Sequence, residues 1–202
     1  MIAFTALLPI ALWAQDNTWE RPEVEEEVVE VKKAVNRDAK YLKGAVTEEN
    51  GKVVFTTTIE APGKTADQIF DIVKNYMTKM TGEKNQHFAR VVVDNKESHE
   101  LGATYDEWLV FKSSALALDQ TRMLYVLKAN CADGKATITM SNIRYIYDEA
   151  RKPLHYTAEE WISDKEALNK KGTRLLPLSG KFRRKTIDRK DFLFNKFESL
   201  LK

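Results

Sequence analysis

Apolar and polar residues alternate along five segments in the middle of the chain, and this pattern predicts five strands. The first segment is residues 52–59, "KVVFTTTI", in which Val53 and Phe55 share one face. Four further alternating segments follow: 87–94, 103–112, 121–131 and 136–147. A period of two is typical of strands that bury one face and expose the other. We therefore expect an antiparallel sheet with one face against the core.

The dipeptide Asp133-Gly134 predicts a hairpin between the last two strands, since both positions tolerate the left-handed backbone of a tight turn. A two-residue loop at this point places Leu127 opposite Met140 on an apolar face. Beyond this pair the apolar pattern slips by one position. One extra residue near Ser141–Asn142, a β-bulge, would restore it.

Along the sequence, one helix is predicted before the four later strands and two helices after them. Thr65 and Gln68 match a capping box at the start of an amphipathic helix that Gly82 ends. A second capping box, Ser163 with Glu166, predicts a short helix closed by Gly172.

The C-terminal residues predict a last helix with Thr186 as its N-cap, because apolar residues recur there at helical spacing. The order of the main elements is then β-α-β-β-β-β-α. This order indicates an α+β domain with about five strands and helices packed on one face.

Three stretches of this region carry a family resemblance: "GKVVFTTTIEAPGKTADQIFDIVKNYM", "GATYDEWLVFKSS" and "LKANCADGKATITMSNIRYIYD". Together, over about residues 50–150, they resemble a bacterial family of domains of unknown function, number 4468, which has a TATA-binding-protein-like fold. The later segment from "AEEWISDKEALNKKGTRLL" to "GKFRRKTIDRKD" is similar to longer exported members from Gram-negative anaerobes. The resemblance implies the fold and no established activity, so no catalytic residues carry over. A fold name of this kind does not imply DNA binding.

The N-terminal residues predict export. Residues 1–14 are apolar apart from Thr5 and fit a signal peptide, although a buried N-terminal strand or helix is the alternative. Residues 15–48 form a charged extension, helical or partly disordered, and residues 49–202 a single α+β domain. No later apolar run reaches the roughly 20 residues that a membrane-spanning helix needs. We expect a soluble mature protein in the periplasm or associated with the cell envelope.

Charge is unevenly distributed along the chain. The net charge of +2 over 202 residues argues against general binding of polyanions. Residues 20–30 carry six Glu against one Arg, whereas residues 181–190 carry six Lys or Arg against one Asp. The two ends could therefore pair with each other inside the same chain.

Motifs for catalysis, metals and cofactors are missing from the sequence. The single cysteine, Cys131, excludes an internal disulfide. The three histidines, His87, His99 and His155, form no closely spaced ligand pair. There is no Gly-rich phosphate loop and no G-x-S-x-G motif. We predict no catalytic residue, no cofactor and no metal site.

The residues Arg183, Arg184 and Lys185 are the main candidate contact, with an anion or with a partner. They precede the predicted start of the last helix, where they could hold a phosphate, an acidic glycan or a lipid headgroup. The alternative is that they pair with acids of the same chain, such as those of residues 20–30. Nucleic acid is not an expected partner, because export removes the protein from it.

A weaker candidate is a glycan contact at Trp161, which Glu159 and Glu160 flank. Such a segment can also pack its Trp on the core and leave the acids in solvent. The sequence thus favours an exported, non-enzymatic binding module whose partner is an envelope protein, a glycan or a small anion. The alternative is a hydrolase of envelope or dietary glycans. Two facing carboxylates in a deep cleft would indicate the enzyme, and a flat or filled sheet face the binding module.

Overall fold

The computed structural model describes residues 37–114 and 117–202. The predicted signal peptide, residues 1–14, and residues 15–36 of the predicted extension lie outside the described part. Tyr41 and Val46, near the end of that extension, are buried in the core of the domain. No helix among the described residues has the length and apolar character required to cross a membrane.

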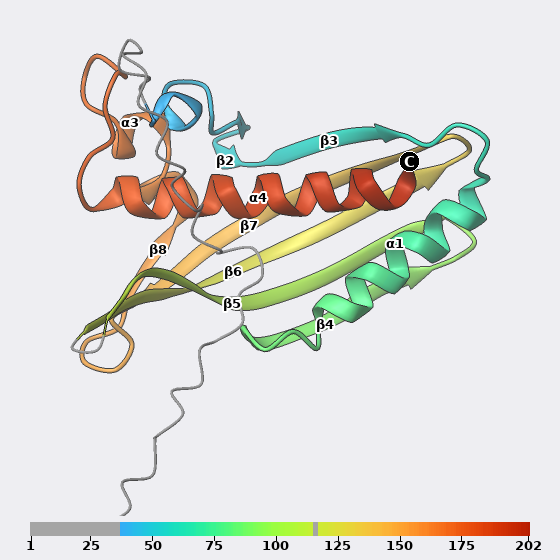
Figure 1. Cartoon of the computed structure of the whole chain (residues 1–202), viewed down its shortest axis with the longest axis horizontal. Coiled ribbons are helices and arrows are strands. Elements are labelled where there is room, and N and C mark those ends of the chain that lie inside the picture. Colours follow the sequence, from blue (N-terminus) through green and yellow to red (C-terminus); the bar gives the residue numbers. More distant parts are fainter. Residues whose placement is uncertain (1–36, 115–116) are drawn as a thin grey trace, which may run out of the picture.

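The domain is built on an antiparallel sheet of six strands (Figure 1). The strands of the main path, in spatial order, are β3 (Phe55–Glu60), β7 (Lys135–Tyr147), β6 (Ala117–Ala132), β5 (Glu100–Ser114) and β4 (Gln86–Asn95). The sixth strand, β8 (Leu154–Thr157), pairs with the second half of β7. The predicted α+β class and antiparallel sheet are confirmed.

The predicted count of five strands is too low. β8 was missed because its four residues follow Pro153 and are too few to show an alternating pattern; its pairing with β7 determines its conformation. The predicted strand 52–59 is also divided in two. Its start forms β2 (Lys52–Val53), which pairs with β1 (Glu48–Glu49) in a separate two-stranded sheet.

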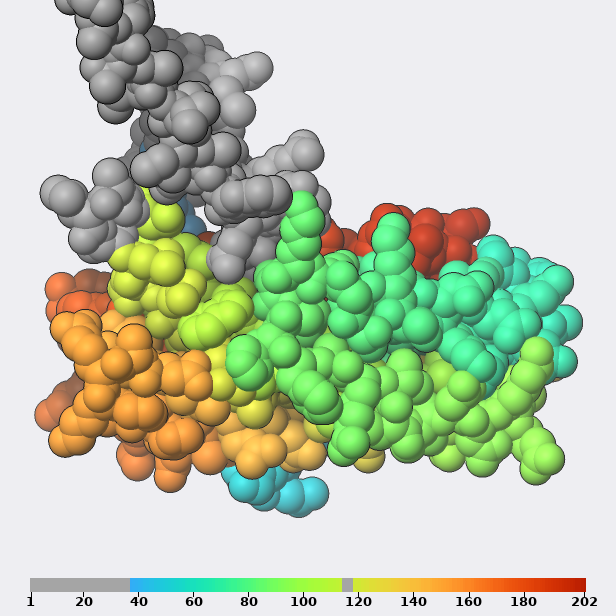
Figure 2. Space-filling view, turned by 90° about the horizontal axis from the view of Figure 1, so that it is seen from below, coloured from blue at the N-terminus to red at the C-terminus, as the bar shows by residue number. Residues whose placement is uncertain are grey.

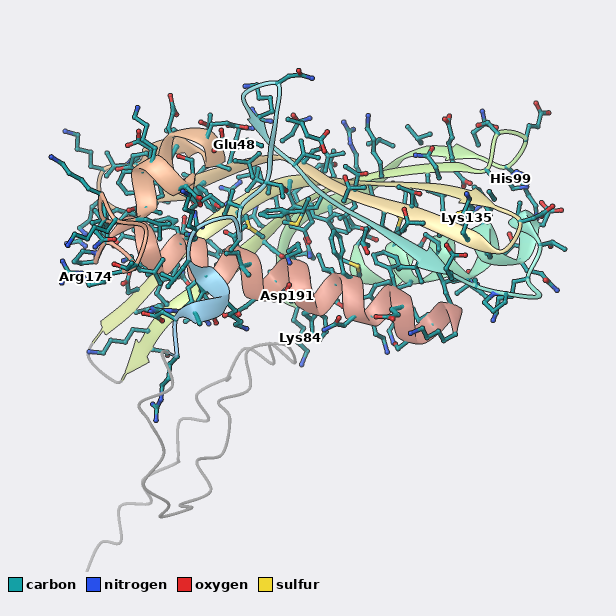
Figure 3. All side chains as sticks on the ribbon, turned by 90° about the horizontal axis from the view of Figure 1, so that it is seen from above. Glu48, Lys84, His99, Lys135, Arg174 and Asp191 are labelled. Carbon is teal, nitrogen blue, oxygen red and sulfur yellow. The ribbon has the colours of Figure 1, made fainter. Side chains whose placement is uncertain are left out.

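Two helices pack on the same face of the main sheet: α1 (Ala66–Met80) and α4 (Ser179–Leu201). Figure 2 shows the edge of the molecule where α1 and β4 lie side by side in green. In Figure 3, α4 lies on one side of the sheet and the β1–β2 hairpin, marked by Glu48, projects on the other. Three short helices complete the fold: η1 (Ala39–Tyr41), α2 (Ala158–Trp161) and α3 (Asp164–Ala167).

The alternation in β6 shows how the core is formed. Met123, Tyr125 and Leu127 are at most 2% exposed and point toward the helices. Leu127 pairs with Met140 across the hairpin, as predicted. The predicted bulge is also confirmed, because the register between β6 and β7 shifts there and Asn142 adopts a φ of 53°.

The helix starts were predicted with mixed success. The Thr65–Gln68 capping box at α1 is present. Ser163 precedes α3 without a capping bond from its side chain, and α3 ends at Ala167 rather than at Gly172. Thr186 is not an N-cap, because α4 begins at Ser179 and Thr186 lies buried inside the helix, with its hydroxyl 2.7 Å from that of Tyr145. The basic residues 183–185 are therefore inside the helix rather than before it.

Candidate functional site

Arg183 is buried and connects three segments of the chain. Its side chain is 0% exposed. The guanidinium donates to the carbonyl oxygens of Tyr41 at 2.6 Å, Leu42 at 2.7 Å and Ile162 at 2.7 Å, and to a carboxylate oxygen of Asp164 at 2.6 Å. These four acceptors surround the guanidinium, so Arg183 attaches α4 to η1 and to the α2–α3 segment.

The neighbours of Arg183 also have partners inside the chain. Arg184 forms an ion pair with Asp38 at 2.5 Å and lies 5.5 Å from the ring centroid of Tyr41. Lys185 is half-buried and is likewise engaged. Two of the acids that pair here, Asp38 and Asp164, belong to neither the Glu-rich residues 20–30 nor the 159–160 pair considered from the sequence.

Trp161 packs into an aromatic cluster on the helix side of the sheet. Its ring stacks on Tyr156 with a centroid distance of 3.9 Å and an interplanar angle of 10°. Its other close neighbour is Phe182, whose ring meets it edge-on at 5.8 Å. A sugar-stacking Trp needs one ring face open to its ligand, and Tyr156 covers one face of Trp161.

The two acids beside Trp161 each make a different structural bond. Glu159 accepts a hydrogen bond of 2.8 Å from the backbone N–H of Val53 and so ties α2 to β2. Glu160 forms a capping box with Thr157, and these hydrogen bonds lower the pKa of Glu160 below its ordinary value. The two carboxylates therefore do not act as a facing pair.

A buried ion pair under the sheet was missed by the sequence analysis. Arg189 donates to both carboxylate oxygens of Glu107 at 2.7 Å, and the two side chains are at most 1% exposed. Asn85 and Gln86 donate to the same carboxylate at 3.2 and 2.9 Å. Burial raises the pKa of the neighbouring Tyr125 well above its ordinary value. Glu107 occupies a core-facing position of a strand with alternating polarity. A carboxylate at such a position needs a buried cation as its partner, and this pattern was the signal in the sequence that could have predicted the pair.

The sheet face opposite α1 and α4, called here the uncovered face, has no helix over it among the described residues. At its centre Asp106 accepts hydrogen bonds from Arg122, including one of 2.9 Å from Nε. The Nδ1 atom of His87 lies 3.5 Å from the same carboxylate. This acid is thus neutralised by its own chain, and it points away from Glu107, as expected for neighbours on a strand.

Two adjoining hollows of about 190 and 270 Å³ cross the uncovered face. They share Leu124 and Arg144. The first is also lined by Phe88, Thr104, Asp106, Val126 and Asn142, and the second by Ile146, His155, Tyr156, Thr157 and Glu160. The lining combines apolar side chains with a few polar ones, which is the usual character of a binding surface.

Arg90, Lys128 and Arg144 are exposed on the uncovered face, and none of them forms an ion pair with a described residue. The strand register places Arg144 beside Leu124, and Leu124 in line with Phe88 two strands away. Phe88 is 59% exposed, and the guanidinium of Arg90 lies 5.9 Å from its ring centroid. The face therefore offers apolar surface next to positive charge that the described part of the chain does not neutralise.

Little in the described residues supports reactive chemistry. They contain no group of three His, Cys, Asp or Glu side chains placed to hold a metal ion. Burial raises the pKa of the Cys131 thiol to about 11, so that almost none of it is thiolate at neutral pH.

Comparison with known proteins gives a family and related structures. The family model described as a domain of unknown function (DUF4468) with TBP-like fold matches residues 55–146. The chain is similar to a DUF4468 family protein from Bacteroides ovatus whose crystal structure is known. The two sequences are 37% identical, the structures superpose with a TM-score of 0.76, and the alignment covers 81% of this chain and 94% of that one. A TBP-like protein from Parabacteroides distasonis is 22% identical with a TM-score of 0.65 over 77% and 96% of the two chains, and shows the same fold. No curated protein matches the chain significantly.

Proposed function

The chain belongs to the DUF4468 family of domains of unknown function with a TBP-like fold, and from its geometry we propose that it is a non-enzymatic binding module. Its uncovered face binds an acidic, partly apolar segment of a partner in the cell envelope. The location in the envelope rests on the apolar residues 1–14, which fit a signal peptide.

The observation that carries the proposal is the set of cations without ion-pair partners beside exposed apolar side chains. Arg90, Lys128 and Arg144 form no ion pair with a described residue, so a carboxylate that neutralises them has to come from outside this part of the chain. An acidic partner supplies the missing charge, and its apolar groups cover Phe88 and the hollows around Leu124. The basic residues of α4 do not serve this purpose, because Arg183 is already enclosed by acceptors.

The hydrolase alternative finds less support. Glycoside hydrolysis usually uses two carboxyl groups on opposite sides of the scissile bond. The acids considered from the sequence are each engaged separately: Glu159 with a backbone N–H, Glu160 in a cap, Asp106 with Arg122 and Glu107 with Arg189. None of these contacts brings two of them together across a cleft.

Fluorescence anisotropy tests the proposal with a labelled peptide in which glutamates are interspersed with leucines. The parent protein should bind this peptide, and added salt should weaken binding. The triple variant Arg90→Gln, Lys128→Gln, Arg144→Gln should bind at least tenfold more weakly. A matched control, Lys79→Gln, Lys170→Gln, Lys171→Gln, removes the same charge from exposed positions elsewhere.

The control separates a site from general electrostatics. Equal weakening in both triple variants would mean that only net charge matters, and binding unchanged in the first variant would contradict the proposal. Phe88→Ser removes apolar surface without changing charge. It should weaken binding of the leucine-containing peptide and leave binding of a peptide with serine in place of leucine unchanged.

A further inference from the structure

A second surface lies at the opposite edge of the sheet from β4, where β3 runs beside α4. We propose that the free edge of β3 takes up an extended, basic peptide segment of a partner protein as an additional strand. This site is independent of the uncovered face, since it uses a strand edge and the polar side of α4.

The outward groups of β3 follow from its pairing with β7. The backbone N–H of Ala61 donates to the carbonyl oxygen of Gly134 at 2.7 Å, in register with the antiparallel ladder. Because bonded and non-bonded positions alternate in such a ladder, every second residue back from Ala61 bonds to β7. The N–H and C=O groups of Thr56, Thr58 and Glu60 therefore point away from the sheet.

Side-chain distances support this assignment. The hydroxyl oxygens of Thr56 and Thr139 are 3.3 Å apart, and so are those of Thr58 and Thr137. Close side chains across an antiparallel ladder are typical of the pairs that exchange no backbone hydrogen bonds. No strand among the described residues pairs with the outer edge of β3, so its outward donors and acceptors are available to another chain.

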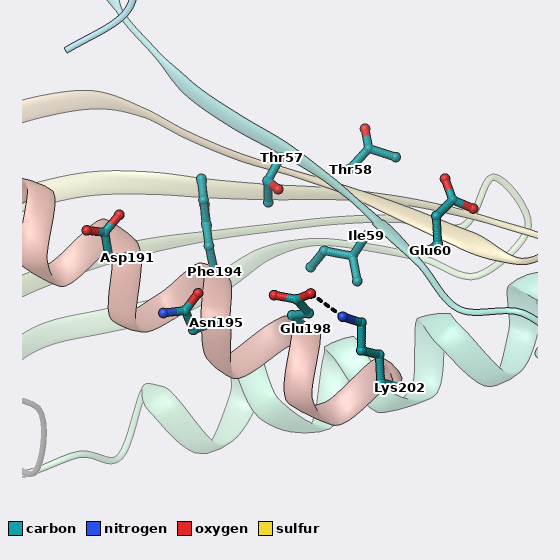
Figure 4. Close-up of a pocket in the computed structure, with 9 residues that line it drawn as sticks. All are labelled: Thr57, Thr58, Ile59, Glu60, Asp191, Phe194, Asn195, Glu198 and Lys202. Carbon is teal, nitrogen blue, oxygen red and sulfur yellow. Dashed lines mark hydrogen bonds and ion pairs between the residues drawn. The ribbon is translucent and has the colours of Figure 1, made fainter. Parts of the chain in front are cut away.

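A groove of about 410 Å³ runs along this edge (Figure 4). On the helix side Asp191, Asn195 and Glu198 follow each other at helical spacing and point toward β3. The remaining lining residues are Thr57, Thr58, Ile59, Glu60, Phe194 and Lys202. The groove thus has a backbone edge on one side and a polar helix face on the other, which suits an extended peptide added by strand pairing.

Charge indicates which peptide fits. Three carboxylates line the groove, those of Glu60, Asp191 and Glu198, against the single lining lysine Lys202, and Asp191 also forms an ion pair with Lys190. Lys202 pairs with Glu198 at the exposed end of α4, and exposed pairs of this kind contribute little and exchange partners readily. Glu60 has no ion pair with a described residue. A basic segment complements this lining, and an acidic one is repelled.

The other free edge, β4, is less suited to the same purpose. Its register with β5 shifts twice, between Gln86 and Phe88 and between Val91 and Val93. Shifts of this kind twist a strand and interrupt the ladder that an added strand must follow. The register of β3 runs without interruption from Phe55 to Glu60.

Residue-resolved amide hydrogen exchange by NMR tests the proposal on the full chain. The probe is a ten-residue peptide of alternating lysine and threonine. In the free protein the amides of Thr56, Thr58 and Glu60 should exchange quickly, while that of Thr57 is protected. Saturating peptide should slow exchange of the first three at least tenfold and leave the amides of β4 unchanged.

Two controls distinguish strand addition from attraction of charges. The same peptide with an N-methyl group at every residue keeps its charge but cannot donate backbone hydrogen bonds from either edge, and it should not protect these amides. The variant Asp191→Asn, Glu198→Gln should weaken binding of the unmodified peptide at least fivefold. The matched variant Asp71→Asn, Glu97→Gln, at exposed positions elsewhere, should not.

Several outcomes would overturn the proposal. Equal protection by the N-methylated peptide would show charge attraction alone, and protection confined to β4 would place the added strand elsewhere. Protection of Thr58 that grows with protein concentration in the absence of peptide would make a second copy of the chain the occupant. The variant Arg90→Gln, Lys128→Gln, Arg144→Gln should still bind the basic peptide at β3, whether or not it binds the acidic peptide. The two proposals can therefore be contradicted independently of each other.

Discussion

The two faces of the central sheet both carry cations but use them differently. On the covered face, Arg183 and Arg189 are buried and donate to carbonyl or carboxylate oxygens of the same chain. On the uncovered face, Arg90, Lys128 and Arg144 have no ion-pair partner among the described residues. A dense basic run in a sequence is therefore a poor guide to a binding surface. Only the folded structure shows which cations are paired with acceptors of the same chain and stabilise the fold, and which cations remain available to bind a partner.

The strongest test of this comparison uses neighbours on β6 that point to opposite faces. Leu127 is 0% exposed, whereas Lys128 is exposed on the uncovered face. Leu127→Asp buries an unpaired charge and should unfold the domain, while Lys128→Asp should change the free energy of unfolding by less than about 0.5 kcal/mol. Circular dichroism with urea titration measures both. Equal effects of the two changes would mean that the faces are wrongly assigned.

The next largest effect is expected at the buried ion pair. Arg189→Met leaves the carboxylate of Glu107 without its main partner and should cost about 4 kcal/mol of unfolding free energy. Adding Glu107→Leu removes the stranded charge and should recover much of this loss. Urea unfolding of both variants is the measurement. A loss below about 1 kcal/mol for Arg189→Met would show that the pair is not closed in solution.

A smaller contrast is expected within α4. Arg183→Met removes four hydrogen bonds from a buried guanidinium and should cost about 2–3 kcal/mol, as for hydrogen bonds to a buried charge. Arg184→Gln removes one partly exposed ion pair with Asp38 and should cost less than about 1 kcal/mol, with a smaller effect in high salt. Similar losses for the two variants in thermal and urea melts would contradict the different roles assigned to them.

The last contrast concerns pH and involves groups buried on the covered face. Burial raises the pKa of Cys131 to about 11 and that of Tyr76 to about 12. Both groups hold their protons to higher pH when folded than when unfolded, so stability is complete below about pH 8 and falls as pH rises from the unfolded pKa values, about 8.5 for Cys and about 10 for Tyr, toward the folded ones. Cys131→Ala removes the thiol, so the loss of unfolding free energy should then begin only near the ordinary pKa of Tyr, at about pH 10. Unfolding free energies that stay constant between pH 7 and pH 11 would contradict this.

Local features of the fold were readable from the sequence because they depend on few residues. The Asp133-Gly134 turn determined the pairing of Leu127 with Met140, and the slip in the apolar pattern located the bulge. The Thr65–Gln68 capping box marked the start of α1. In each case the signal lies within a short window and the physical cause is local.

The start of α4 and the partners of the basic residues could not be predicted from the sequence in the same way. α4 begins at Ser179 without a side-chain cap and Thr186 is buried against Tyr145, so tertiary packing overrides the local capping signal. The partners of Arg183 are separated from it by up to 142 residues. Nothing in the sequence around Arg144 distinguishes it from Arg183; only the strand register places it beside Leu124 on an uncovered surface.

Two triple variants compared side by side test the central claim most directly. The first is Arg90→Gln, Lys128→Gln, Arg144→Gln, and the second is Arg183→Gln, Arg184→Gln, Lys185→Gln. Each removes three positive charges, and both are measured for urea unfolding and for binding of the glutamate-leucine peptide. The first should unfold like the parent and bind at least tenfold more weakly, whereas the second should lose more than about 2 kcal/mol of stability and, where folded, bind like the parent. Parental stability with lost binding in the second variant would contradict the account and return the binding site to α4.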